Sequence, residues 1–182
     1  MKSINLRETQ TVSKSITMYN ASIPVLVHAF KSLSAILDKA HHHAADKKID
    51  ESVFLNYRLA PDMFPMSRQV QIAGNYSMGF VARMSGKEVP VLENSETSFT
   101  ELKARISKII DYLNAADPSA LIGSEDREII FPVGGQPKTF KGIDYLNSFL
   151  LPNVYFHISM CYAILRHSGL EIGKNDYLGT NI

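Results

Sequence analysis

The sequence predicts an all-α fold: a four-helix bundle in up-down-down-up order, with a small β-hairpin between helices 3 and 4. Apolar residues recur every three or four positions over four long segments, which is the spacing of an amphipathic helix. A stretch of twelve residues without periodicity separates the second segment from the third, and it favours a crossover along the bundle over simple alternation. Two adjacent glycines between β-prone residues predict the hairpin.

The first helix is expected over roughly residues 16 to 46, where Val25 and Leu37 belong to the apolar stripe. Pro24 has no amide hydrogen, so it cannot make the hydrogen bond that a residue in a helix interior makes. We therefore expect the helix to begin near Ser22 or to be kinked at Pro24.

The second long helix is expected from about residue 65 to 84, after a short helical turn at residues 53 to 57. Pro65 suits the first turn of a helix, and Gly86 suits the position just past its end. The residues that follow, GKEVPVLENSET, would reach about 40 Å when fully extended, which is enough to cross the bundle.

The third helix should open at Ser98, because Ser98 and Glu101 form the pattern of a capping box. Farther on, β-rich runs flank Gly134-Gly135. Two strands alone are marginally stable, so we expect this hairpin to pack against the helices. The fourth helix is expected from about residue 143 to 167.

Length and charge limit the classes of function. The chain has 182 residues, 45% of them hydrophobic, which suits one domain over residues 15 to 182 and a flexible N-terminal arm over residues 1 to 14. Nineteen basic residues oppose eighteen acidic ones without a long basic run, so we expect no nucleic acid and no membrane as partner. A single cysteine and no apolar leader indicate a soluble, reduced, cytoplasmic protein. Symmetry favours a homodimer if the chain self-associates.

Asn153, His157 and Cys161 lie four residues apart on the fourth helix and therefore share one face. Apolar neighbours on this face indicate that it points inward. A buried imidazole normally finds a hydrogen-bond partner, so His157 is either a satisfied core histidine or part of a pocket that grips a ligand or a cation. Cys161 is either a small core residue or a thiol nucleophile with His157 as its base.

Three segments carry a resemblance to a known superfamily: LAPDMFPMSRQVQIA (59 to 73), LPNVYFHISMCYAILRHSG (151 to 169) and GKNDYLG (173 to 179). They resemble the DinB/YfiT-like proteins, a superfamily of bacterial four-helix bundles, and more closely an uncharacterised bacterial branch known only as a domain of unknown function. The resemblance covers about residues 15 to 179. Many such relatives bind a divalent metal through three histidines, and some are metal-dependent thiol S-transferases or isomerases.

The resemblance places the metal ligands of those relatives on Gln71, Asn153 and His157. Only one of the three is a histidine, and a neutral amide oxygen is a poor donor for zinc or nickel. We therefore expect no cofactor and a degenerate metal site, a polar cluster that hydrogen-bonds internally or faces a small organic ligand. The alternative is a thiol S-transferase or isomerase in which His157, with Gln71 and Asn153, holds Zn or Ni. A third hypothesis is a protein with an interaction role only.

Tyr57, Arg58 and Asp62 precede the second long helix and are expected near one end of the bundle. There they would form a rim over the polar cluster, with Arg58 able to bind a carboxylate through two hydrogen bonds. The alternative is an ion pair between Arg58 and Asp62 that organises a proline-rich loop.

Three consecutive histidines, His41, His42 and His43, stand near the expected end of the first helix. Neighbouring residues on a helix point about 100° apart, so the three side chains cannot converge on one metal ion. We interpret them as a solvated helix end, where each cationic group stabilises the helix by roughly 0.3–1 kcal/mol. Adventitious or specific metal binding is the alternative.

Overall fold

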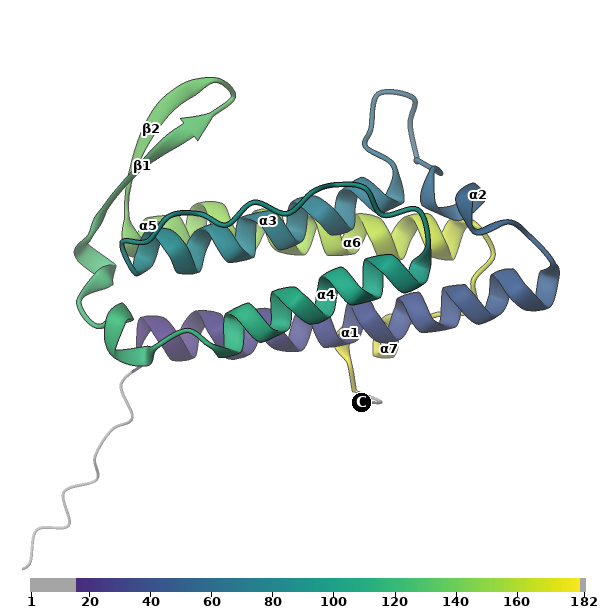
Figure 1. Ribbon diagram of the computed structural model, residues 1–182, viewed down its shortest axis with the longest axis horizontal. Helices are drawn as coiled ribbons and strands as arrows, with labels where there is room; N and C mark the ends of the chain where they lie inside the picture. The colour runs from purple at the N-terminus through teal and green to yellow at the C-terminus, as the bar shows by residue number, and fades with distance from the viewer. Residues whose placement is uncertain (1–15, 181–182) are drawn as a thin grey trace, which may run out of the picture.

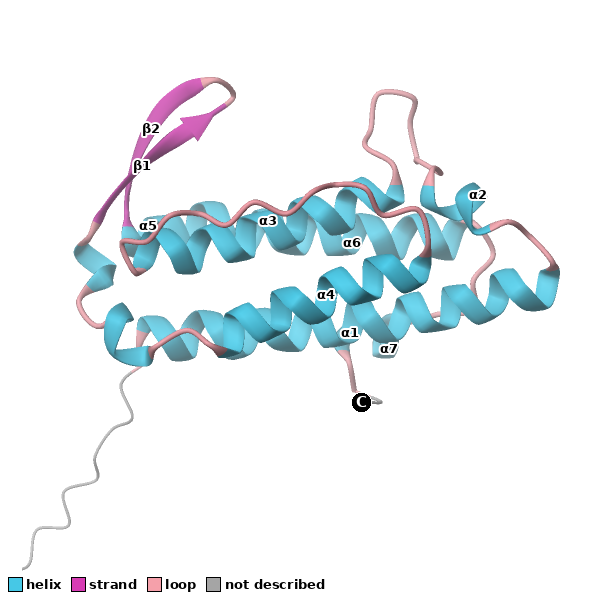
Figure 2. Ribbon diagram, viewed as in Figure 1, coloured by secondary structure: helices cyan, strands magenta, loops and turns pink. Residues whose placement is uncertain are grey.

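Residues 16–180 are described by a computed structural model of the chain. Four long helices lie in two layers, with α3 beside α6 in one and α1 beside α4 in the other (Figure 1). Their bounds are Met18–Lys47 (α1), Met66–Met84 (α3), Phe99–Asn114 (α4) and Leu151–His167 (α6). The shorter elements are α2 (Glu51–Leu55), 3-10 turns at Pro118–Leu121 and Ser124–Asp126, β1 (Glu128–Val133), β2 (Gln136–Lys141), α5 (Gly142–Asp144), a π-helical stretch (Tyr145–Leu150) and α7 (Lys174–Leu178). The expected helical fold with one hairpin is confirmed (Figure 2).

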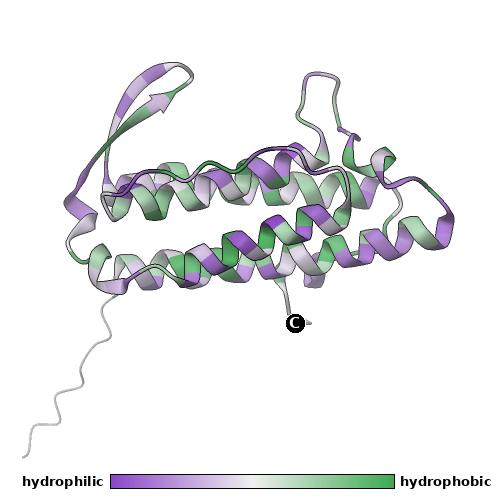
Figure 3. Cartoon of the chain, in the orientation of Figure 1, coloured by the Kyte–Doolittle hydropathy of each residue, from purple (hydrophilic) through white to green (hydrophobic). Residues whose placement is uncertain are grey.

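The core lies between the four long helices. Helix α3 packs against α6 and α4, and α1 packs against α4 and α6. Each long helix contributes large side chains with no exposed surface, among them Phe30, Phe80, Phe99 and Ile164. Hydrophobic and hydrophilic residues are interleaved along each of these helices (Figure 3). Burial of the apolar faces is therefore the main force that holds the bundle together.

Helix α1 begins one turn earlier than expected. The hydroxyl oxygen of Thr17 caps it by accepting a hydrogen bond from the Asn20 amide at 3.1 Å, and Pro24 lies inside the helix. The expectation of a start near Ser22 is wrong, because Ser22 is a buried helical residue whose hydroxyl donates to the Met18 carbonyl at 2.6 Å. A side-chain cap at residue 17 satisfies the first free amide and lets the helix extend.

Residues 85–98 form a crossover without regular structure that runs along α3 from one end of the bundle to the other (Figure 2). Its end caps α4, since the Ser98 hydroxyl oxygen accepts from the Glu101 amide at 3.1 Å. The Glu101 carboxylate accepts from the backbone amide of Thr97 at 2.6 Å. The capping signal read from the sequence therefore marks the start of the third long helix, as expected.

A buried arginine on α4 holds this crossover against the bundle. Arg105 is 3% exposed, and it donates to the Glu93 carbonyl and to the Glu96 carboxylate, both at 2.7 Å. Its other terminal nitrogen donates to the side-chain oxygen of Asn75 on α3 at 2.8 Å. One guanidinium group thus joins α3, α4 and the crossover.

The hairpin packs against the helices through aromatic side chains. Gly134 and Gly135 make the turn with φ of 60° and 79°, a conformation that glycine adopts without strain. Phe131 of β1 lies edge-to-face with Phe149, with ring centroids 5.0 Å apart, and with Tyr145 at 5.1 Å. The hairpin therefore leans on the helical run that begins at Gly142, as a two-stranded sheet must.

Two helical runs, Met18–Lys47 and Gly142–His167, are long and apolar enough to cross a membrane by length and composition alone. Their apolar side chains form the core of the bundle instead; Leu33 and Ile164, for example, have no exposed surface. The pattern is that of core helices in a soluble protein.

Candidate functional site

The candidate site lies where α3 packs against α6, and it is built on a histidine–glutamine pair. His157 of α6 is 7% exposed and Gln69 of α3 is 1% exposed. Nδ1 of His157 and Oε1 of Gln69 are 2.6 Å apart. Two polar side chains from different helices thus satisfy each other in the interior, as buried polar groups require.

The hydrogen bonds of Gln69 determine which imidazole nitrogen carries the proton. The Gln69 amide nitrogen donates to the backbone carbonyl of Phe64 at 3.0 Å. Its oxygen must therefore face His157, and an oxygen only accepts. Nδ1 of His157 is then the donor, and the unprotonated Nε2 keeps a free lone pair.

The imidazole is neutral near physiological pH. Burial, and to a smaller extent the positive charge of Arg68, together lower the pKa of His157 from 6.5 to about 4. A neutral imidazole whose Nε2 is unprotonated can accept a hydrogen bond, take a proton or ligate a metal.

Aromatic rings surround His157 on two sides. Tyr76 of α3 stacks on the imidazole with centroids 5.9 Å apart, and Phe156 meets it edge-on at 5.3 Å. Tyr76 in turn lies edge-to-face with Phe149 at 5.3 Å. The imidazole therefore continues the aromatic cluster that supports the hairpin, and these contacts fix its orientation.

The structure corrects one residue of the predicted cluster. The side-chain nitrogen of Gln71 donates to the Glu96 carboxylate at 2.9 Å, and its oxygen accepts from Arg68 at 3.1 Å. The prediction that Gln71 faces His157 is wrong. Gln69 contacts His157, and two residues farther along the helix the side chain of Gln71 points about 200° away from that direction. Gln69 takes that place. No local pattern in the sequence distinguishes Gln69 from Gln71, because both lie on the same predicted helix and both are buried.

Asn153 lies one turn before His157 on the same face of α6, as the spacing predicts. It is half-buried, and its amide nitrogen donates to the backbone carbonyl of Phe149 at 2.6 Å. This carbonyl belongs to the π-helical stretch Tyr145–Leu150, which is followed by Pro152 in the first turn of α6. The side-chain amide of Asn153 thus satisfies a backbone carbonyl in the irregular helical turn before Pro152.

The predicted rim lies away from the cluster. The Tyr57 ring is 5.8 Å from the ring of His167, in the last turn of α6 and about 15 Å along the helix from His157. Arg58 is exposed and donates to the Met63 carbonyl at 3.3 Å, and Asp62 is exposed. Between residues 16 and 180, no ion pair joins Arg58 to Asp62. Phe64, in the same loop, approaches the site through its carbonyl instead.

Comparisons with known proteins identify the family. Residues 18–178 match the family described as a domain of unknown function (DUF1993). The chain belongs to this family. The crystal structure of a DinB family member from Shewanella denitrificans is 39% identical in sequence, with a TM-score of 0.82 over 88% of this chain and 91% of that one. The DUF1993 chain is therefore also a DinB family member, and the resemblance seen in the sequence is confirmed. None of the curated proteins matches it.

Cys161 is a core residue of this DinB bundle. It has no exposed surface, and its Sγ lies 3.8 Å from the Met66 carbonyl. Burial raises the pKa of the thiol far above its ordinary value, so the thiolate needed for nucleophilic attack is suppressed. The structure therefore favours the reading of Cys161 as a small hydrophobic side chain.

The three histidines at the end of α1 make three different contacts. His41 Nδ1 lies 2.5 Å from the Glu51 carboxylate, and His42 Nδ1 lies 2.7 Å from the Asp38 carbonyl. The ring of His43 meets Phe54 edge-on at 5.9 Å. The side chains diverge, as expected for neighbouring residues of a helix.

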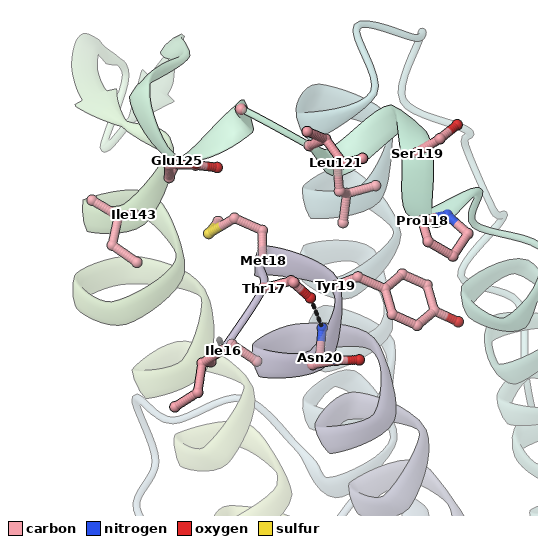
Figure 4. A pocket seen from close by; sticks show the side chains of 13 residues that line it. Ile16, Thr17, Met18, Tyr19, Asn20, Pro118, Ser119, Leu121, Glu125 and Ile143 are labelled. Atoms are coloured by element: carbon pink, nitrogen blue, oxygen red, sulfur yellow. Dashed lines mark hydrogen bonds between the residues drawn. The ribbon is translucent and has the colours of Figure 1, made fainter. Parts of the chain in front are cut away.

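A hollow of about 840 Å³ lies away from His157, where α1 begins (Figure 4). Its lining is mostly apolar and comes from the first turn of α1, the segment 118–125 and Ile143. The lining residues include no histidine, cysteine or arginine. It also borders Ile16, the first described residue, so its volume is that left by the described part of the chain. Glu125 is the one charged residue of its lining, and no residue of the lining belongs to the His157 site.

The pKa of His157 leads to a prediction about stability. The unfolded chain takes up a proton at residue 157 near pH 6.5, whereas the folded chain resists it until about pH 4. Above pH 6.5 the neutral His157 therefore costs the folded state nothing relative to the unfolded state. As the pH falls from 6.5 towards 4, protonation favours the unfolded chain and the free energy of unfolding decreases. We expect this residue to account for roughly 1–3 kcal/mol of acid destabilisation, and a His157→Phe variant to lack that part.

Urea unfolding at about pH 7.5 and about pH 4.5 tests the prediction. The first value lies above the window between the unfolded pKa of 6.5 and the folded pKa of about 4, and the second lies inside it. The exposed His42 provides the control, and His42→Phe should keep the wild-type loss of stability on acidification. An equal loss in wild type and His157→Phe would contradict the prediction.

Proposed function

We propose that this DinB family member is a cytoplasmic, non-catalytic protein that binds a small organic ligand, and that its four long helices follow an up-down-down-up order. Its site corresponds to the metal site of the three-histidine relatives, with Gln69, Asn153 and His157 in the ligand positions. The site has become a hydrogen-bonded polar cluster. A homodimer is part of the proposal, and light scattering tests it.

The hydrogen bonds of Gln69 are the observation that carries the proposal. A metal ligand in this position would need a free donor atom, but Oε1 of Gln69 accepts from His157 Nδ1 and its nitrogen is held by the Phe64 carbonyl. Asn153, one helical turn before His157, has its nitrogen bound to the Phe149 carbonyl and could offer only a neutral amide oxygen. A neutral amide oxygen is a much weaker donor to zinc or nickel than an imidazole nitrogen, so one imidazole and two amides lack two of the three strong donors of the relatives. The donor set therefore fits a hydrogen-bonding cluster better than a transition metal.

The metal content of the untagged full-length protein tests this proposal. After incubation with Zn²⁺ or Ni²⁺ and desalting, we expect far less than one metal ion per chain. Replacing Gln69 and Asn153 together by histidine should restore the imidazole donors and give about one bound ion per chain. The matched control is Gln71→His with Asn153→His, which should not bind, because Gln71 faces Glu96.

A different result would favour the metal-dependent thiol transferase or isomerase. Stoichiometric Zn or Ni in the wild-type protein, lost in His157→Ala, would overturn the proposal. Equal metal binding by the Gln69 and Gln71 double variants would show that the ligand geometry proposed for α3 is wrong.

A further inference from the structure

We propose that the ligand of this site is a small carboxylate that also carries a hydrogen-bond donor, with Arg68 binding the carboxylate and Nε2 of His157 accepting from the donor. The inference rests on the proposed function and names the chemical class of its ligand. Neither Arg68 nor the protonation pattern of His157 was recognised from the sequence. Both follow from contacts made in the folded protein.

His157 offers an acceptor with nothing bound to it. Its Nδ1 is engaged with Gln69, while Nε2 makes no hydrogen bond to the described residues. Within residues 16–180, Arg105 Nε is the one side-chain nitrogen or oxygen that is both sealed from solvent and without a hydrogen-bond partner. Nε2 of His157 is not in that situation. Nε2 is therefore not fully sealed from solvent, although His157 as a whole is 7% exposed, and a group that binds Nε2 must donate a hydrogen bond.

Arg68 supplies the charge. It is half-buried one residue before Gln69, and it donates to the neutral amide oxygen of Gln71 at 3.1 Å. No carboxylate in the described part of the chain lies within ion-pair distance of it. The Arg68 guanidinium lies over the ring of Phe64, and the carbonyl of Phe64 holds Gln69, the partner of His157. Arg68 and His157 therefore border the same Phe64–Gln69 contact, and the positive charge of Arg68 lowers the pKa of His157. A guanidinium group with spare donors is suited to bind a carboxylate through two hydrogen bonds.

Exposed aromatic rings flank these polar groups. Phe64, whose ring lies 5.9 Å from the Arg68 guanidinium, is 55% exposed, and Phe156 beside His157 is 51% exposed. The loop that contains Phe64 and the β1–β2 hairpin both project from the layer formed by α3 and α6 (Figure 1). The ligand would therefore meet an apolar surface on either side of the two polar contacts, and a ligand with an apolar body fits best.

The charge also excludes other classes of ligand. A cationic ligand would be repelled by Arg68, and the neutral imidazole does not compensate for this repulsion. A neutral alcohol would use His157 and leave the guanidinium without a charged partner. A carboxylate without a donor would leave Nε2 without one.

Three probes that differ by one group test the inference: mandelate has a hydroxyl and a carboxylate, phenylacetate lacks the hydroxyl, and benzyl alcohol lacks the carboxylate. Calorimetric titration of the full chain should give the tightest binding for mandelate. Arg68→Gln should weaken mandelate and phenylacetate roughly tenfold and leave benzyl alcohol unchanged. His157→Phe should weaken mandelate to about the level of phenylacetate. Arg58→Gln is the matched control, because this exposed arginine bonds, within residues 16–180, to the Met63 carbonyl.

Each outcome bears on the inference. Benzyl alcohol that binds as tightly as mandelate, in a manner that needs His157, would overturn the inference and leave the proposed function standing. The same holds if mandelate binding is unaffected by Arg68→Gln. No binding of any probe at about 20 mM would also overturn it, because one ion pair and one hydrogen bond should be detectable there. The metal measurement tests the proposed function independently, and circular dichroism verifies that each variant is folded.

Discussion

Gly142→Ala is expected to destabilise the protein by more than about 3 kcal/mol, or to prevent folding. A Cβ atom at this position would lie 1.8 Å from the carbonyl oxygen of Ser124 and 2.8 Å from the Cε atom of Met84. The first contact is with backbone, which cannot rotate away as a flexible side chain can. Gly142 starts the helical run that carries Asn153 and His157. Segment 124–126 can approach this run closely only because residue 142 has no side chain.

Thermal and urea unfolding measure this effect, and two other glycines calibrate it. Gly173→Ala should be nearly neutral, because a Cβ there meets nothing within 4 Å. Gly74→Ala should fall between the two, since its Cβ would lie 2.3 Å from the Cδ1 atom of Ile109, the movable end of a side chain. A Gly142→Ala protein as stable as Gly173→Ala would contradict the prediction.

Arg105→Met is expected to cost about 3–5 kcal/mol, because it removes one partner of a buried ion pair. Glu96, whose side chain is 12% exposed, would lose its counter-charge, and the Glu93 carbonyl and Asn75 would lose their donor. Of the side-chain hydrogen bonds that tie Glu96 to the helices, only the one from Gln71 would then remain among the described residues. We therefore expect the crossover to open as well as the global stability to fall.

Two measurements separate these effects. Urea unfolding gives the global loss, and limited proteolysis under native conditions should show new cleavage within residues 85–98. Lys108→Met, on the exposed face of the same helix, should change stability by less than about 0.5 kcal/mol. Adding Glu96→Gln to Arg105→Met should recover part of the loss, because it removes the stranded charge. A wild-type cleavage pattern in Arg105→Met would show that the arginine does not anchor the crossover.

The elements that sequence predicted well depend on local patterns. The apolar stripes, the Ser98 cap and the glycine pair act within a few residues, and each lies where it was expected. The elements that it missed depend on distant contacts. The π-helical stretch Tyr145–Leu150 lies under the aromatic residues of the hairpin, and α7 is tied to α1 by Lys39 and Asp176.

The candidate site shows the same division at the level of single residues. The sequence alone identified His157 and placed Asn153 on its face, because residues four apart on one helix are neighbours whatever surrounds them. It also assigned the DinB family, through motifs that survive in the chain. Which glutamine of α3 faces the imidazole was decided only by the tertiary structure.

Sequence by itself thus determined a helical bundle, a hairpin, one inward-facing histidine and the family. Tertiary structure decided the partners: Gln69 in place of Gln71, Arg68 beside the imidazole and Arg105 beneath the crossover. The physical reason is the phase of the helix. Each residue turns the side chain by about 100°, so the direction of a polar group depends on how two helices, far apart in the sequence, are rotated against each other.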